Sequence, residues 1–289
     1  MLHAGDTIAL VGCSDGRPEQ ERPLLEALAT ALEFMGFRVV CSPYLYAKDG
    51  TPFSAPPRQR AEALSALFAD PSVAAIFDVS GGDGANGLLE YLDFPALSRK
   101  PKLFFGYSDL TALMNPLWEK AGIPCYLYQI KNILLDASGA QMNAFLDTLP
   151  GDGGSLFDIP WRFIRGDAME GTVLGGNIRC LLKLAGTPYF PDLRNKVLFL
   201  ESYGGGPARI EAYFWQLRQM GVFDQISGLL LGTFTELDRT GIAPGAEELT
   251  LDIADRPDLP VARTDRVGHG IDSLCLPLGK YRRISKAFT

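Results

Sequence analysis

The chain has 289 residues, of which 47% are hydrophobic and 21% are charged, a composition typical of a globular protein with one large or two medium domains. Its formal net charge of -7 argues against a nucleic-acid partner, because a surface that binds phosphates needs an excess of Lys and Arg. No apolar stretch approaches the roughly 18 residues of a membrane-spanning helix. Residues 1–12 also lack the basic start of a secretory signal, so we expect a cytoplasmic protein without membrane association.

The cysteines and histidines argue against a metal site. The chain has an odd number of cysteines and no CxxC pair, so we expect reduced thiols in the core rather than disulfides or zinc ligands. Only two histidines are present, which excludes a His-rich metal centre. We therefore expect no metal and no other cofactor. The cysteines are Cys13, Cys41, Cys125, Cys180 and Cys275.

Short apolar runs alternate with helical patterns along the first half of the chain. This alternation predicts a parallel sheet with crossover helices. Strands are predicted at 7–12 and 37–42, from 73 into a glycine turn at 81–84, and at 102–106. Helices are predicted at 22–36, 57–70 and 85–92, and around 139–149.

The second half is richer in strands and has fewer crossover helices. A glycine-rich stretch at 150–155 separates the two halves. We predict an α/β protein whose N-terminal domain (1–150) has a parallel sheet of the flavodoxin or glutamine-amidotransferase type. A linker (151–168) then leads to a smaller, strand-rich α+β domain (169–289).

Ser108 follows the predicted strand at 102–106 and precedes a helical pattern. Ligands of parallel α/β sheets bind outside the carboxyl ends of the strands, so Ser108 and the glycine turn at 81–84 are expected on one edge. Serine is also a preferred N-cap residue. Its position alone leaves Ser108 as a helix cap or as a nucleophile.

A serine nucleophile needs a base that takes its proton and an acid that orients the base. His3 lies at the N-terminus, whereas His269 stands between two glycines in "VGHG". Glu201 directly follows the apolar strand "VLFL". A surface turn and a strand end that meets solvent are the ordinary alternatives for these two residues.

Several stretches, in order along nearly the whole chain, resemble the LD-carboxypeptidase family of serine peptidases, which includes murein tetrapeptide carboxypeptidases and microcin C immunity carboxypeptidases. The resemblance implies Ser108 as nucleophile, His269 as general base and acid, and Glu201 as the carboxylate that orients the imidazole. It places the active site between the two domains and implies a homodimer, although the helical stretch 211–221 could serve as core instead. The stretches are "FADPSVAAIFDVSGGDGANGLLEYLDF", "FGYSDLTAL", "GGNIRCLLKLAGTPYFPDLRNKVLFLES", "RIEAYFWQLRQMGVFDQISGLLLGTF" and "VGHGIDSLCLPLG".

Backbone amides around Ser108 can form an oxyanion hole. The amide of Asp109 lies at the expected helix N-terminus, and Gly82 or Asp83 of the glycine turn can supply a second one. The Asp109 carboxylate is expected to interact with the helix dipole and not to act in catalysis. The turn lacks the Lys and Ser/Thr of a P-loop, which argues against nucleotide binding. Substrate contacts are expected from Gly81, Tyr107 and Tyr203.

The chain departs from the family pattern before the glycine turn, where Ser80 stands in place of the usual Arg, and within it at Asp83. A cation at that place could contact a substrate carboxylate. The expected activity is hydrolysis of the C-terminal residue of a short peptide through an acyl-enzyme, with D-Ala of a murein tetrapeptide as one candidate. The alternatives are a microcin C-type peptide-nucleotide hydrolase, a serine esterase or amidase, and a non-catalytic ligand-binding protein with Tyr107, Trp161 and Tyr203 as pocket walls.

Overall fold

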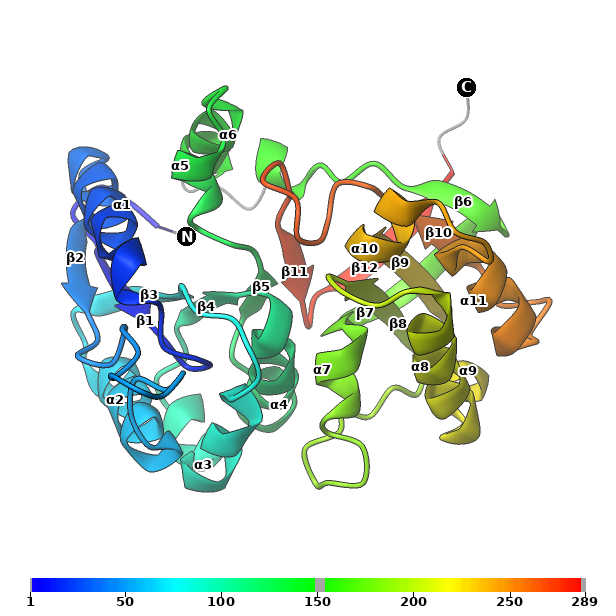
Figure 1. Cartoon of the computed structure of the whole chain (residues 1–289), viewed down its shortest axis with the longest axis horizontal. Coiled ribbons are helices and arrows are strands. Elements are labelled where there is room, and N and C mark those ends of the chain that lie inside the picture. Colours follow the sequence, from blue (N-terminus) through cyan, green and yellow to red (C-terminus); the bar gives the residue numbers. More distant parts are fainter. Residues whose placement is uncertain (1, 149–153, 287–289) are drawn as a thin grey trace.

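The computed structural model describes residues 2–148 and 154–286, which form two lobes side by side (Figure 1). Each lobe is built around a six-stranded sheet with helices packed against it. The expectation of an α/β protein with two domains is therefore confirmed.

The N-terminal sheet has the strand order β11-β5-β4-β3-β1-β2. All its pairs are parallel except β11 with β5, which is antiparallel. Its strands are β1 (Thr7–Val11), β2 (Arg38–Cys41), β3 (Val73–Asp78), β4 (Leu103–Gly106), β5 (Cys125–Leu127) and β11 (Leu276–Leu278). The helices of this half are α1 (Arg22–Phe34), α2 (Pro57–Ala69), α3 (Phe94–Ser98), α4 (Thr111–Ala121), α5 (Asn132–Leu135) and α6 (Ala140–Thr148). The segment predicted as a helix at 85–92 forms 3-10 turns over Ala85–Tyr91.

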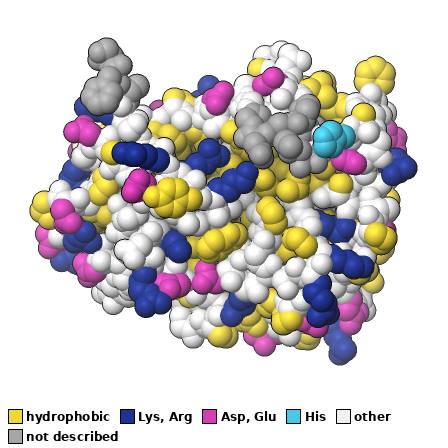
Figure 2. Space-filling model, turned by 180° about the vertical axis from the view of Figure 1, so that it is seen from behind, with side chains coloured by type: hydrophobic (Ala, Val, Ile, Leu, Met, Phe, Trp, Pro, Cys, Tyr) yellow, Lys and Arg dark blue, Asp and Glu magenta, His cyan; other side chains and the backbone are white. Residues whose placement is uncertain are grey.

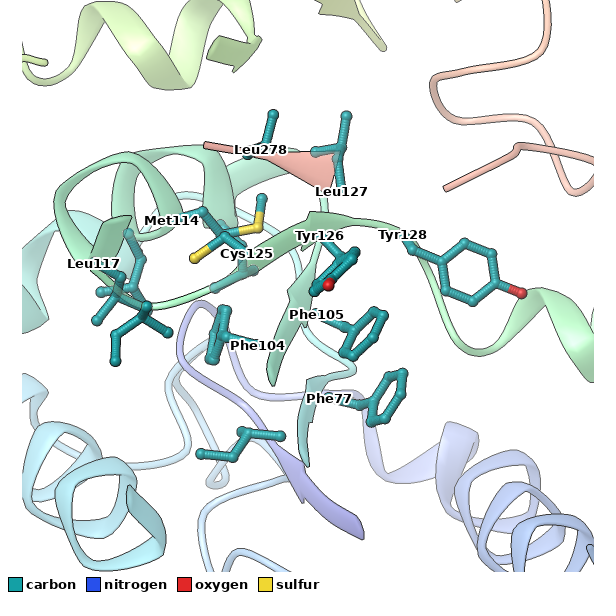
Figure 3. Packing of buried hydrophobic residues seen from close by; sticks show 14 of the residues in the cluster. Phe77, Phe104, Phe105, Met114, Leu117, Cys125, Tyr126, Leu127, Tyr128 and Leu278 are labelled. Atoms are coloured by element: carbon teal, nitrogen blue, oxygen red, sulfur yellow. The ribbon is translucent and has the colours of Figure 1, made fainter. Parts of the chain in front are cut away.

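Stacked aromatic rings connect the three central strands of this sheet. The ring centroid of Phe105 lies 4.2 Å from that of Phe77 and 4.6 Å from that of Tyr126, in near-parallel planes. Figure 3 shows these rings in line across β3, β4 and β5. Offset stacking adds to the burial of such large side chains. The rings stabilise the strand whose carboxyl end leads to Ser108.

The C-terminal sheet has the strand order β12-β7-β8-β9-β10-β6. Neighbouring strands from β7 to β10 are parallel, and β12 and β6 close the two edges in antiparallel pairing. Helices follow β7, β8 and β9, a more regular alternation than the α+β description of this half suggested. The strands are β6 (Arg162–Arg165), β7 (Ala168–Asn177), β8 (Lys196–Ser202), β9 (Gly228–Phe234), β10 (Val261–Arg263) and β12 (Tyr281–Ser285). The helices are α7 (Ile178–Leu182), α8 (Pro207–Gln219), α9 (Val222–Gln225), α10 (Thr235–Thr240) and α11 (Ala246–Ala254).

Two strands bear on how the halves are connected. β6 lies in the segment expected as a linker and pairs with β10, whereas residues 151–153 of that segment lie outside the described residues. β11 comes from the C-terminal half of the chain and pairs with β5 of the N-terminal sheet, between the two lobes in Figure 1. The chain therefore returns to the first lobe after His269 and ties the two together.

The surface agrees with the composition. On the face seen in Figure 2, basic and acidic side chains are interspersed rather than gathered into a basic stripe. In the described ranges, every helix is too short or too polar to cross a bilayer. All five cysteines are free thiols, and all but Cys41 are buried, as expected for core residues.

Candidate active site

Ser108 lies on a sharp turn between β4 and α4. Tyr107 is still extended, with φ -153°, whereas Ser108 has φ 55°, in the left-handed region that costs a non-glycine residue about 1–3 kcal/mol. A 3-10 turn over Ser108–Leu110 then leads into α4. Such strain at a strand-to-helix turn is typical of nucleophile elbows, which expose a serine at the top of a sheet.

The helix-cap interpretation of Ser108 is wrong. The N-cap position of the 3-10 turn is Tyr107 and that of α4 is Leu110, and neither forms a side-chain cap. Among residues 2–148 and 154–286, no hydrogen bond engages the Ser108 hydroxyl. The strained conformation therefore presents a hydroxyl that local structure does not use.

Glu201 and His269 are brought together at the carboxyl edge of the C-terminal sheet. His269 Nδ1 lies 2.7 Å from Glu201 Oε2, and the Glu201 side chain is only 1% exposed. The other carboxylate oxygen, Oε1, accepts a hydrogen bond of 2.9 Å from Asn177 Nδ2. With the carboxylate ionised, Nδ1 of the imidazole is the donor, which leaves Nε2 to accept a proton.

The neighbourhood of His269 includes residues of both lobes. Its ring centroid lies 5.5 Å from that of Tyr107 and 4.9 Å from that of Tyr203. Asn132 of the N-terminal lobe donates a hydrogen bond of 3.2 Å to the carbonyl of Gly270. The histidine loop thus lies against the residue that precedes Ser108, across the boundary between the lobes.

Tyr107 and Tyr203 differ in burial. Burial raises the pKa of the Tyr107 hydroxyl to about 12, so this side chain is a neutral wall. Tyr203 is 63% exposed and its ring also contacts the imidazole. Trp161, the third aromatic residue considered, packs edge-to-face on Phe199 with ring centroids 6.4 Å apart.

The glycine turn after β3 is held by the loop after β1. The amide of Asp15 donates to the carbonyl of Gly81 at 3.2 Å, and Asp15 Oδ1 accepts from the amide of Asp83 at 3.2 Å. Gly82 has φ 126°, and a Cβ there would lie 2.2 Å from Asp15 Cγ, so only glycine fits. The Asp83 amide already donates to the Asp15 side chain. This bond distinguishes it from the other amides expected in the oxyanion hole.

Charged side chains of α7 and the residue after it join this turn to the second lobe. Arg179 contacts the Asp83 carboxylate and donates to the Gly82 carbonyl at 3.1 Å. Lys183 Nζ lies 2.8 Å from Asp83 Oδ1 and 2.5 Å from Asp109 Oδ1. The turn that approaches Ser108 is therefore fixed by cations of the other lobe.

The Asp109 carboxylate is completely buried and has fixed partners. Its Oδ2 accepts from the Ser14 hydroxyl at 2.6 Å and from the Ala85 amide at 2.8 Å. Together with Lys183, these bonds connect the start of α4 to the loop after β1, to the glycine turn and to the second lobe. This is a larger structural role than the helix-dipole interaction expected from the sequence.

Ser80, where the resemblance led us to expect an Arg, is also buried and structural. Its hydroxyl donates to Asp78 Oδ1 at 2.5 Å and accepts from the Ser14 amide at 2.9 Å. Burial raises the pKa of Asp78, whose other oxygen accepts from the Cys13 amide at 2.7 Å. This position therefore supports the turn and presents no cation to a substrate.

Sequence reasoning missed two residues that contact the candidate site, Asn177 and Lys183. Asn177 ends β7 and pairs in register with Glu201 at the end of β8, and its side chain also caps α7. A polar residue after the apolar run of β7 was the available signal. Lys183 offered none, because its partners lie in the other lobe.

A metal centre finds no support in the donor set. Across the described ranges, no group of three or more His, Cys, Asp and Glu side chains is placed to hold a metal ion. The chemistry available at the lobe boundary is that of a strained serine hydroxyl, an imidazole bound to a carboxylate, and backbone amides.

Comparisons with known proteins identify the family. Residues 8–129 match the family model of the LD-carboxypeptidase N-terminal domain, and residues 170–284 match that of the LD-carboxypeptidase C-terminal domain. The microcin C7 self-immunity protein MccF of Escherichia coli is 27% identical over 96% of this chain and 90% of its own. The murein tetrapeptide carboxypeptidase of Pseudomonas aeruginosa is 27% identical over 77% of this chain and 76% of its own.

Solved structures show the same two-lobed fold. MccF in complex with glutamyl sulfamoyl guanosine superposes with a TM-score of 0.87 at 25% identity, over 98% of this chain and 94% of that one. A muramoyltetrapeptide carboxypeptidase from Oxalobacter formigenes gives a TM-score of 0.81 at 26% identity, over 97% and 95%. From its sequence and its fold, this chain belongs to the LD-carboxypeptidase family.

Proposed function

We propose that this carboxypeptidase hydrolyses the C-terminal D-Ala of a short murein-derived peptide through an acyl-enzyme on Ser108. The observation that carries the proposal is the 2.7 Å contact between His269 and Glu201, positioned against Tyr107 beside a strained and unbonded serine. The family and its murein peptidases supply the substrate class.

The proposed reaction uses the groups at the lobe boundary in sequence. Ser108 Oγ attacks the scissile carbonyl carbon while His269 Nε2 takes the hydroxyl proton, and Glu201 stabilises the imidazolium that forms. The C–N bond then breaks, and His269 gives the proton to the leaving amine. A water molecule, activated by the same imidazole, hydrolyses the ester and frees Ser108.

The developing oxyanion needs donors that are fixed in advance. We assign this role to the backbone amides of Gly82 and Asp109, because the amide of Asp83 already donates to Asp15. Gly81, Tyr107 and Tyr203 are proposed to line the substrate. In the free enzyme the serine and imidazole are not hydrogen-bonded to each other across the described residues, and such bonds often tighten only when substrate binds.

A second candidate is hydrolysis of a peptide-nucleotide of the microcin C type. This candidate is favoured by the similarity to MccF, which extends over 96% of this chain and 90% of MccF. A solved structure of MccF contains glutamyl sulfamoyl guanosine. The same nucleophile and base would act, and only the leaving group would differ. A serine esterase or amidase activity and non-catalytic ligand binding are the remaining alternatives.

A panel of substrates separates these functions. Murein tetrapeptides, aminoacyl sulfamoyl nucleosides and p-nitrophenyl esters are incubated with the protein, and the products are identified by mass spectrometry. We expect release of D-Ala from the tetrapeptide, and a loss on the order of 10⁴ to 10⁶ in kcat for Ser108→Ala with an unchanged circular dichroism spectrum. Cleavage of the nucleosides alone would favour the second candidate, and undiminished turnover by Ser108→Ala would exclude the mechanism.

The assembly and the location of the protein stay predictions. Ile210, Phe214 and Leu217 of α8 are buried within one chain, so this face of the helix belongs to the core and is not a dimer surface. A homodimer and a cytoplasmic location are therefore proposed on the family resemblance and the composition alone.

A further inference from the structure

Arg17 and Lys131 place two positive charges at the carboxyl edge of the sheet that also holds Ser108, and the proposed chemistry uses neither of them. Gly106 of β4 pairs with Leu127 of β5, so Ser108 and Lys131 both follow the carboxyl ends of paired strands. Arg17 follows β1, which is separated from β4 only by β3. The two cations therefore approach the edge that holds Ser108 from opposite sides of β4.

Electrostatic and hydrogen-bond contacts show that this cluster borders the active site. The charges of Arg17 and Glu21 both act on the Tyr107 hydroxyl, and that of Asp78 acts on Tyr107 and on Lys131. The residue after Lys131, Asn132, donates to the carbonyl next to His269. The cluster thus adjoins Tyr107 on one strand end and the histidine loop on the other.

The cluster is short of negative charge. Arg17 binds Glu21 through Nε at 2.9 Å and through Nη2, and Lys131 Nζ lies 3.6 Å from the same carboxylate. That distance exceeds the range of good hydrogen bonds, and over the part of the chain that the structure describes no closer acceptor meets Lys131 Nζ. One carboxylate therefore serves two cations.

The other acids of the site already bind other groups. Asp78 is engaged by Cys13 and Ser80, and burial raises its pKa. Glu201 is engaged by His269 and Asn177. Burial lowers the pKa of Lys131, and the nearby Arg17 charge lowers it further. A bound anion would favour the charged form of Lys131 and so counteract both effects.

A ligand can reach this charge. The Lys131 side chain is 5% exposed, whereas those of Arg17 and Glu21 are 18% and 28% exposed, so the cluster reaches solvent through Arg17 and Glu21. Nη1 of Arg17 has no partner among the described residues and remains free to donate. A planar guanidinium beside an ammonium is well suited to hold a carboxylate.

Resting on the proposed function, we propose that Arg17 and Lys131 bind the free α-carboxylate of the substrate's C-terminal residue. A peptidase that removes a terminal residue must recognise that carboxylate, and Ser80 stands where an Arg could otherwise have done so. In this proposal, the segments that follow β1 and β5 supply the positive charge, and the residue before the glycine turn does not.

Binding measured without turnover tests the subsite. In a Ser108→Ala background, calorimetry compares a murein tetrapeptide ending in D-Ala with the same peptide capped as a C-terminal carboxamide. We expect the free acid to bind at least about tenfold more tightly, which is the effect of one charge-assisted hydrogen bond. Adding Lys131→Met or Arg17→Gln should abolish this preference and leave the affinity for the carboxamide within about twofold.

Controls separate this proposal from the proposed function. Arg58→Gln removes a cation from an exposed pair with Glu62 on α2 and should leave the preference intact. Equal binding of acid and carboxamide, no binding of either, or a preference that survives in both variants would overturn the subsite. If the wild-type protein fails to cleave the tetrapeptide although the Lys131-dependent preference is present, the proposed function fails and the subsite stands. Thermal melts of each variant confirm that it is folded.

Discussion

Two buried carboxylates lie at the lobe boundary, and their partners differ. Glu201 is 1% exposed and binds an imidazole and a side-chain amide. Asp109 is 0% exposed and binds an ammonium, a hydroxyl and a backbone amide. Both are costly to bury without partners, so burial alone marks both as important. The imidazole beside Glu201 has a second ring nitrogen that can accept a proton, whereas the ammonium, hydroxyl and amide around Asp109 all donate to it.

From this difference we infer different tasks for the two carboxylates. A carboxylate that orients a general base contributes to rate, and one that is held by permanent donors contributes to the folded geometry. Substitutions by the matching amide keep the shape and remove the charge in each case. They therefore test the comparison directly.

Of the two carboxylates, Glu201 is expected to give the larger loss of activity when it is changed to Gln. The amide cannot stabilise the imidazolium, so kcat should fall on the order of 10³ to 10⁴, while the melting temperature changes little. Steady-state kinetics on the cleaved peptide and a thermal melt provide the measurements. A loss of less than tenfold would place Glu201 with Asp109 as a structural group.

Asp109→Asn should act mainly on stability. Among the residues that the structure describes, the substitution leaves Lys183 with the exposed Asp83 alone as ionic partner, and breaking a buried pair costs about 3 kcal/mol or more. Urea denaturation measures this free energy of unfolding. Asp83→Asn is the matched control, because that carboxylate is 65% exposed and its loss should cost under about 1 kcal/mol. Equal losses for the two variants would contradict the structural assignment.

Asn177→Ser should give the smallest effect. Serine can still cap α7 through its hydroxyl, but it cannot donate to Glu201 as the amide does. Since a neighbour that orients a functional carboxylate typically contributes about 10- to 100-fold, we expect kcat to fall by about tenfold. A melting temperature that drops while kcat is unchanged would limit Asn177 to capping.

Much of this site could be predicted from the sequence because its residues lie at the ends of apolar strands. An apolar run precedes each of three features: the glycine turn, Ser108 and Glu201. Each feature is therefore expected at the carboxyl edge of a sheet, and "VGHG" marks the histidine loop. At Gly268, φ is 152° and a Cβ would lie 2.0 Å from Thr233 Oγ1, so the first glycine of that motif is required.

Contacts across the lobes could not be predicted in the same way. The pairing of Lys183 with Asp109, and of β11 with β5, joins residues that no local pattern relates. The positions of Arg17 and Lys131 likewise depend on the strand order β5-β4-β3-β1, because chain order alone does not set these strands side by side. Periodicity identifies elements, whereas these features arise from how the elements assemble.

The central claim is that the His269–Glu201 pair activates Ser108 across the lobe boundary, and the rate of labelling by a fluorophosphonate tests it most directly. Peptide mapping by mass spectrometry identifies the labelled residue in the wild-type protein, His269→Ala and Glu201→Gln. We predict that Ser108 is the modified residue and that both variants slow its labelling on the order of 10³-fold or more. Labelling of another residue, or an equal rate in all three proteins, would contradict the account.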